Sequence, residues 1–170
     1  MRETPAEYTK RMLKYTQNQD GLKIQQSTLK KIERAIAGLT RKQMMTRPAP
    51  DEWSIGEILA HLAEAELVGG YRMRLILSAN GTAIQAFDQD VWAKNSDYAH
   101  QDPRQSLEMF RVLREANLRL LKSIPKKMWG YFGMHQERGK ETIDRLARML
   151  AGHDRNHIQQ IVTIAQGLSH

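Results

Sequence analysis

The sequence has no cysteine among its 170 residues. This absence excludes disulfides, thiolate zinc sites and cysteine nucleophiles, so His, Asp or Glu would have to hold any metal ion. No stretch approaches the roughly 18 apolar residues that a membrane-spanning helix needs. The opening MRETPAEYTK lacks the apolar core of a secretory signal. We therefore expect a cytoplasmic protein without a membrane anchor.

The net charge of +7 is unevenly distributed along the chain. Residues 1–50 contain 11 Lys and Arg against 4 Asp and Glu, whereas the remaining residues are neutral overall. A basic segment can bind nucleic acid or an acidic partner. Here the basic residues are spread out rather than clustered, which is typical of a solvated helix face. Nucleic-acid binding is therefore the weaker of the two interpretations.

The spacing of apolar residues is helical, and no strand-like alternation is present. It predicts a short helix before Asp20 and long helices at residues 22–39, 54–79, 103–124 and 141–168. Two prolines make residues 47–53 a predicted linker. The expected fold is therefore all-α, with residues 1–170 forming one domain built on a four-helix bundle and residues 1–20 as an N-terminal extension.

Two of the predicted helices have clear N-terminal signals. Ser54 and Glu57 match the S-x-x-E capping box, and Trp53 and Ile58 occupy the positions of a hydrophobic staple. Asp102 and Pro103 provide an N-cap and a first-turn proline for the third long helix. The helix starts near residues 54 and 103 are therefore encoded locally.

Three histidines form the candidate metal site. His153 and His157 stand four residues apart, in line with the apolar stripe of the last helix, so their rings can approach one ion together. His61 lies near the edge of the apolar arc of the second long helix and can reach the same point if the two helices are neighbours. Three histidine ligands leave a coordination position open, which is the pattern of catalytic zinc sites. The alternative is that these histidines are core residues of a bundle that mainly dimerises.

Two carboxylates near these histidines are candidates for supporting roles. Glu66 is a possible partner of His61, and we prefer it to Glu64, which points away from the apolar arc. Asp154 stands where an HExxH metalloprotease has glutamate, but its side chain is one carbon shorter. We interpret Asp154 as a surface carboxylate or as a support for a metal ligand.

The segments between the long helices supply further candidates. His135 and Glu137 could lie at the mouth of the site as a proton shuttle or substrate contact. A surface loop is the simpler interpretation. The connection at residues 80–102 is unusually long. We expect Arg72 or Arg74 to pair with Asp88 or Asp90 in this connection and to hold it on the bundle, with a lid over the site as the alternative.

The segments WSIGEILAHLAEAE (53–66) and AGHDRNHIQQI (151–161) resemble the DinB/YfiT-like superfamily of four-helix metalloproteins. The resemblance extends from about residue 20 to residue 168. It implies an up-down-down-up bundle in which residues 80–102 form a crossover between the second and third helices. It also implies a divalent metal ion, zinc or nickel, held by His61, His153 and His157. Relatives are often dimeric, so a homodimer is expected.

The resemblance implies a metal-dependent enzyme with a small-molecule substrate. The reaction would be hydrolysis by metal-bound water or S-transfer by a metal-bound thiolate. Because the chain has no cysteine, that thiol would be a low-molecular-weight cosubstrate. The alternative function is a non-catalytic binding or stress-response module that uses the basic N-terminal segment to hold nucleic acid or a protein partner.

Overall fold

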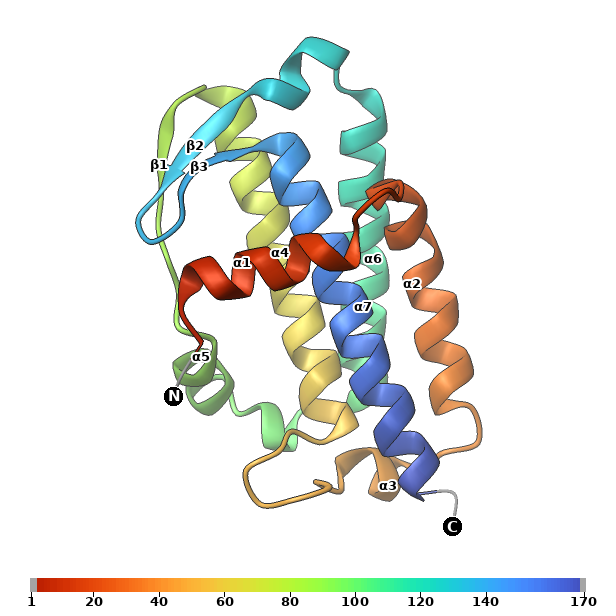
Figure 1. Ribbon diagram of the computed structural model, residues 1–170. Coiled ribbons are helices and arrows are strands. Elements are labelled where there is room, and N and C mark those ends of the chain that lie inside the picture. Colours follow the sequence, from red (N-terminus) through yellow and green to blue (C-terminus); the bar gives the residue numbers. More distant parts are fainter. Residues whose placement is uncertain (1–2, 169–170) are drawn as a thin grey trace.

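The computed structural model describes residues 3–168 and contains a bundle of four long helices (Figure 1). These helices are α2 (Gly21–Ile36), α4 (Ile55–Ser78), α6 (Pro103–Ser123) and α7 (Ile143–Leu168). In Figure 1, α2 and α7 run downward, whereas α4 and α6 run upward. The first and last helices thus run in one direction and the two middle helices in the other, which is the up-down-down-up order. The predicted all-α four-helix bundle is confirmed.

The predicted helix starts form as the sequence indicates. The Ser54 hydroxyl accepts a hydrogen bond from the Glu57 N–H, and the Glu57 carboxylate accepts one from the Ser54 N–H. The Glu57 carboxylate also pairs with Arg47 in the preceding linker. Asp102 caps α6 with two backbone hydrogen bonds, and Pro103 is its first residue. A short helix, α3 (Arg41–Met45), precedes the linker and was not predicted, because one turn is too short to show a period.

The N-terminal extension forms the predicted helix, α1 (Pro5–Tyr15), which lies across α7 (Figure 1). The two helices approach each other closely at Gly152 on α7. A Cβ atom on this residue would lie 2.0 Å from the carbonyl oxygen of Met12. The two helices can therefore touch backbone to backbone only because residue 152 is glycine.

The crossover leads from the upper end of α4 to the lower end of α6 (Figure 1). It contains β1 (Thr82–Ile84), α5 (Gln89–Asn95) and the 3-10 turn η1 (Tyr98–His100). A second 3-10 turn, η2 (Lys126–Gly130), and a hairpin of β2 (Phe132–His135) and β3 (Gly139–Thr142) precede α7. β1 pairs parallel to β2, and β2 pairs antiparallel to β3. This sheet corrects the prediction of no strands, which failed because its strands of three or four residues are too short to show alternation.

Arg72 holds the crossover on the bundle, although not through a carboxylate. Its Nη2 atom donates to the carbonyl oxygen of Gln85 at 2.6 Å, and its guanidinium lies over the Phe87 ring. Arg74 instead donates to Asn117. The expected pairing with Asp88 or Asp90 is wrong, because within residues 3–168 neither Arg72 nor Arg74 forms an ion pair with either carboxylate, and the contacts of both arginines go to other groups. Asp88 caps α5 by accepting hydrogen bonds from the backbone N–H groups of Asp90 and Val91.

The buried apolar residues form two clusters at different heights of the bundle. The cluster at the lower end contains Ile32, Met44, Ile55, Ile58, Leu59, Leu62, Ala63, Phe110, Ile161 and Ala165. The cluster at the upper end contains Met73, Ile76, Ile84, Leu121, Ile143, Leu146 and Ala147. Buried polar residues lie between them, and the candidate site belongs to this middle level. Among residues 3–168, no helix is both long and apolar enough to cross a bilayer.

Candidate metal centre

The structure brings the three histidines together inside the bundle. The Nε2 atom of His153 lies 2.8 Å from that of His61 and 3.1 Å from that of His157. One ring nitrogen from each residue lies within 4.8 Å of the other two. Ligands about 2.0–2.1 Å from a common ion would lie about 3 Å apart, so these separations suit a shared cation.

The three imidazoles are buried and electrically neutral near pH 7. Their residues are 2%, 7% and 7% exposed in the order His61, His153 and His157. Burial lowers the pKa of His61 and His153 well below the ordinary value, and the neighbouring His157 adds to the effect. Burial also lowers the pKa of His157 to about 4, although its hydrogen bond with Gln160 opposes this shift. Neutral imidazole is the form that binds metals.

Gln160 fixes which nitrogen of His157 is available. Its side-chain oxygen lies 2.7 Å from Nδ1 of His157, so Nδ1–H donates to Gln160. In the neutral ring, Nε2 is then a lone-pair acceptor that points at His153. A second partner of this kind orients most metal-binding histidines.

The nitrogen cluster fits a cation better than it fits hydrogen bonding among the rings. His153 Nε2 faces two other ring nitrogens, but it carries at most one proton. If that proton points to His157, the contact with His61 has no proton of its own. If His61 donates instead, His153 and His157 face each other with two lone pairs. A cation shared by the three nitrogens satisfies all of them.

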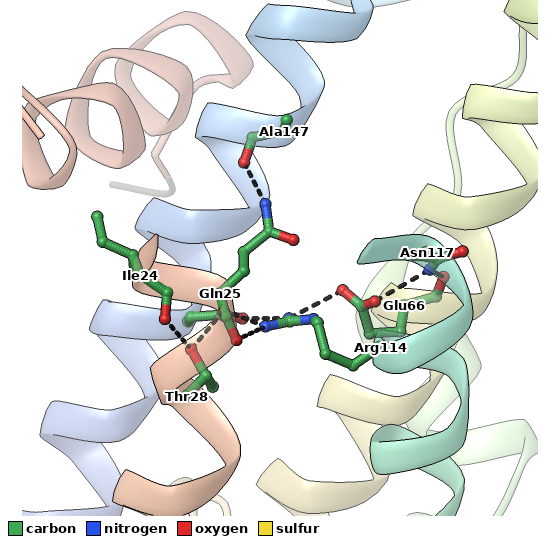
Figure 2. Close-up of polar contacts among 8 residues, drawn as sticks. Ile24, Gln25, Thr28, Glu66, Arg114, Asn117 and Ala147 are labelled. Carbon is green, nitrogen blue, oxygen red and sulfur yellow. Dashed lines mark hydrogen bonds and ion pairs between the residues drawn. The ribbon is translucent and has the colours of Figure 1, made fainter. Parts of the chain in front are cut away.

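A buried polar layer lies beside this centre inside the bundle. Its residues are Gln25 and Thr28 on α2, Glu66 on α4, Arg114 and Asn117 on α6, and Asp154 on α7. Figure 2 shows Arg114 reaching from α6 between Gln25 and Glu66. Arg114 bonds both carboxylate oxygens of Asp154, at 2.6 and 2.8 Å, and Glu66 at 2.9 Å. Burial by itself would lower the pKa of Arg114, but the carboxylates of Asp154 and Glu66 raise it above its ordinary value. The layer therefore joins all four long helices.

A cleft of about 680 Å³ opens beside the histidines. His61 and His153 line it, together with apolar residues of α4 and α7. The far wall comes from the crossover and from the tip of the β2–β3 hairpin. Glu3, Pro5 and Tyr8, in and next to α1, close one side. The N-terminal extension is therefore part of the wall of the candidate site.

The remaining candidates divide into residues on the cleft and residues away from it. Glu137 is exposed and lines the cleft. His135 is buried behind it, where its Nδ1 accepts from the backbone N–H groups of Glu137 and Arg138. Glu66 bonds Arg114 and Asn117 rather than His61, because Arg114 reaches it from the neighbouring helix. Asp154 is buried, so its interpretation as a surface carboxylate is wrong.

Sequence reasoning missed three residues near the centre. Arg114 lies on the same inward-facing stripe of α6 as Phe110 and Asn117. A charged residue at such a position was the signal that could have identified it. Arg72 was assigned only to the crossover, yet it lines the cleft. Tyr8 had no distinguishing signal, since only the docking of α1 on α7 brings it to the cleft.

The chain matches the family model of the DinB superfamily over residues 26–161. This span includes all three histidines and the whole buried polar layer except Gln25.

Curated relatives cover most of the chain. It is 23% identical over 138 residues to "Putative metal-dependent hydrolase YfiT" of Bacillus subtilis, which is 80% of this chain and 77% of that protein. It is 23% identical over 136 residues to "Putative metal-dependent hydrolase OB0782" of Oceanobacillus iheyensis, covering 79% and 78%. The solved structure of Bacillus subtilis YfiT, described as having an unusual four-helix bundle topology, matches with a TM-score of 0.80. That match covers 99% of this chain and 91% of YfiT at 18% identity, and it shows a shared fold.

Proposed function

The chain belongs to the DinB superfamily, and from that premise we propose that it is a metal-dependent hydrolase acting on a small molecule in the cleft. One observation carries the proposal: the Nε2 atoms of His61, His153 and His157 converge where the cleft begins. The names of the relatives support the same class of activity. The hydrogen-bonding conflict among the three nitrogens supports a cation as their partner.

Different residues of the chain would bind the metal ion, orient a ligand and transfer a proton in such an enzyme. His61, His153 and His157 would hold the ion, and Gln160 would keep the His157 lone pair aimed at it. When bound, a divalent cation supplies Lewis acidity, which polarises a substrate oxygen and lowers the pKa of water or a thiol. Glu137 is a carboxylate on the cleft that would take up or deliver a proton.

Metal content is the first test of this proposal. The protein would be purified without a nickel column, analysed for metals, stripped with a chelator and titrated with zinc or nickel. We expect one equivalent per chain and a sharp loss of affinity in His157→Ala. His100→Ala, which changes an exposed histidine, is the matched control. A chain that contains no metal and takes up neither ion would contradict the proposal.

Activity is the second test. We expect the metal-loaded protein to hydrolyse members of a panel of chromogenic esters, amides and phosphoesters, and the stripped protein to be inactive. Glu137→Gln should lower kcat without changing metal affinity. Hydrolysis that survives removal of the metal would contradict the assignment.

The finer expectations from the sequence remain proposals. Zinc and nickel are the proposed ions, and titration with each distinguishes them. S-transfer is proposed as the alternative reaction, in which the chain consumes a low-molecular-weight thiol such as bacillithiol, mycothiol or glutathione. An assay in which turnover requires the thiol as well as the metal would favour transfer over hydrolysis.

The expected partners also remain proposals. A homodimer is supported by exposed apolar side chains on the outer faces of two adjacent helices, Leu67 and Tyr71 on α4 and Met109 and Val112 on α6. Light scattering after size-exclusion chromatography tests it. Nucleic-acid binding through the basic segment would appear as binding that weakens steeply with salt. The docking of α1 on α7 gives part of that segment a structural role instead.

A further inference from the structure

Arg72 stands on the same face of α4 as His61. The two residues are 11 positions apart, which is close to three whole turns and about 16 Å along the helix axis. Between them, Ala65, Val68 and Gly69 line the cleft at helical spacing. The cleft therefore follows one stripe of α4, with a histidine of the candidate centre at one end and an arginine at the other.

The opposite wall gives the cleft an apolar middle. It is formed on α7 by Leu146, Met149 and Leu150, one to two turns before His153. Small or aliphatic side chains of both helices thus line the cleft between His61 and Arg72. A ligand that fills this space would touch the centre at one end, apolar side chains along its length and a guanidinium at the other end.

Arg72 is a buried cation without an acidic partner. The residue is only 8% exposed, and within residues 3–168 no carboxylate lies within ion-pairing distance of it. Nη2 donates to the Gln85 carbonyl, while the other two guanidinium nitrogens have no hydrogen-bond partner there and keep contact with solvent. Burial lowers the pKa of Arg72 to about 10, with Arg138 adding to the effect, so the group stays charged near pH 7.

The acidic residues that line the cleft are differently placed. Glu3, Asp88, Asp90 and Glu137 are all on the exposed rim. Glu3 is paired with Arg11, and Asp88 caps α5. Arg138, the other arginine of the cleft, forms a two-point ion pair with the buried Glu141. Arg72 is thus the cleft arginine that forms no ion pair with a carboxylate of residues 3–168, although Glu141 and Glu137 favour its charge from a distance. Buried charges are normally paired.

We propose that Arg72 binds an anionic group, a carboxylate or phosphate, of an elongated substrate whose apolar middle lies along α4 and α7 and whose reacting end lies at the three histidines. This inference rests on the proposed metal centre and adds the class of substrate to it. Guanidinium groups bind both oxyanions through paired N–H donors, so the two chemistries share one site.

Chelating probes of graded length test the inference. Each probe carries a hydroxamate, which binds zinc, at one end of an alkyl chain. The other end is a carboxylate, its methyl ester or a phosphonate. Binding to zinc-loaded protein is measured by isothermal titration calorimetry. We expect an acid of suitable length to bind about tenfold or more tightly than its ester, which is the value of a charge-assisted hydrogen bond. The phosphonate shows which oxyanion is preferred.

Variants assign that preference to Arg72. In Arg72→Gln, the acid should bind no better than the ester, while zinc affinity stays at the wild-type value. Arg74→Gln, which removes an exposed arginine from the same helix, should keep the full preference. If Arg72→Gln melts early by circular dichroism, Arg72→Lys should retain the charge and part of the preference.

The outcomes separate the two proposals. If the protein binds neither zinc nor any hydroxamate, the proposed metal centre is wrong. If zinc and the esters bind but the acids gain nothing at any length, or the gain survives in Arg72→Gln, the metal centre stands and the role of Arg72 is overturned.

Discussion

Arg114 on α6 donates hydrogen bonds to both carboxylate oxygens of Asp154 on α7, and Asp154 directly follows His153 in the sequence. The ion pair is buried, and Thr28 lies 2.7 Å from the same carboxylate. It therefore fixes the height and rotation of α7 beside His153. The position of one candidate metal ligand thus depends on a residue of a helix that contributes no ligand.

Removing the Arg114 guanidinium should strongly destabilise the folded protein. Arg114→Leu leaves Glu66 and Asp154 buried without their cation, and we expect the free energy of unfolding to fall by about 3–5 kcal/mol. Arg111→Leu is the control, because Arg111 forms exposed ion pairs on the same helix and should cost less than about 1 kcal/mol. Urea unfolding of both variants measures the difference. Equal effects would show that the buried pair does not stabilise the fold.

Gln160 should control metal affinity without contacting the ion. Gln160→Ala removes the acceptor of His157 Nδ1–H, so the ring is free to rotate and to change tautomer. We expect zinc affinity to fall by about 10–100-fold. Gln159→Ala removes the exposed neighbouring glutamine and should bind zinc as the wild type does. Competition with a chromogenic chelator gives both values, and unchanged affinity in Gln160→Ala would argue against this orienting role.

His135 should make the metal-free protein less stable in acid. Burial lowers the pKa of His135 to about 4, and Arg138 adds to this shift, whereas an unfolded histidine titrates near pH 6.5. The unfolded chain therefore binds the proton more readily, so this stability is complete above about pH 6.5 and is lost as the pH falls towards about 4. We expect a loss of roughly 1–2 kcal/mol, reduced by solvent screening near the hairpin.

Variant proteins isolate this contribution from that of the other histidines. His135→Asn offers an oxygen to the same backbone N–H groups but does not titrate, so its unfolding free energy should depend less on pH than that of the wild type. His100→Asn changes an exposed histidine and should follow the wild-type curve. Parallel curves for the wild type and His135→Asn would refute the assignment.

The contact between α1 and α7 should not tolerate a methyl group at residue 152. In Gly152→Ala the new Cβ meets the Met12 carbonyl, so α1 has to move away from the cleft. We expect a loss of about 1–3 kcal/mol and faster amide hydrogen exchange in α1. Gly167→Ala is the control, since nothing lies within 4 Å of its Cβ position. It should be neutral or stabilising by up to about 1 kcal/mol. Wild-type exchange rates in Gly152→Ala would contradict the predicted clash.

Short-range chemistry explains which features could be predicted. Ser54 and Glu57 satisfy each other within one turn, and His153 and His157 share a face because four residues make about one turn. His61 could be added because its helix has an apolar arc that must face the bundle. By contrast, the pairing of β1 with β2 joins segments about fifty residues apart, and no local pattern specifies it.

The amino-acid sequence by itself determined the all-α class, the helix starts and the three histidines, because each depends on spacing within a few turns of helix. Only the tertiary structure decided that Arg114 is buried between two carboxylates, that Arg72 faces a cleft and that α1 forms part of its wall. A charged side chain at an inward position has no fixed partner until other helices bring one to it. The environment of each arginine is therefore a property of packing across the bundle, not of the residues beside it in the chain.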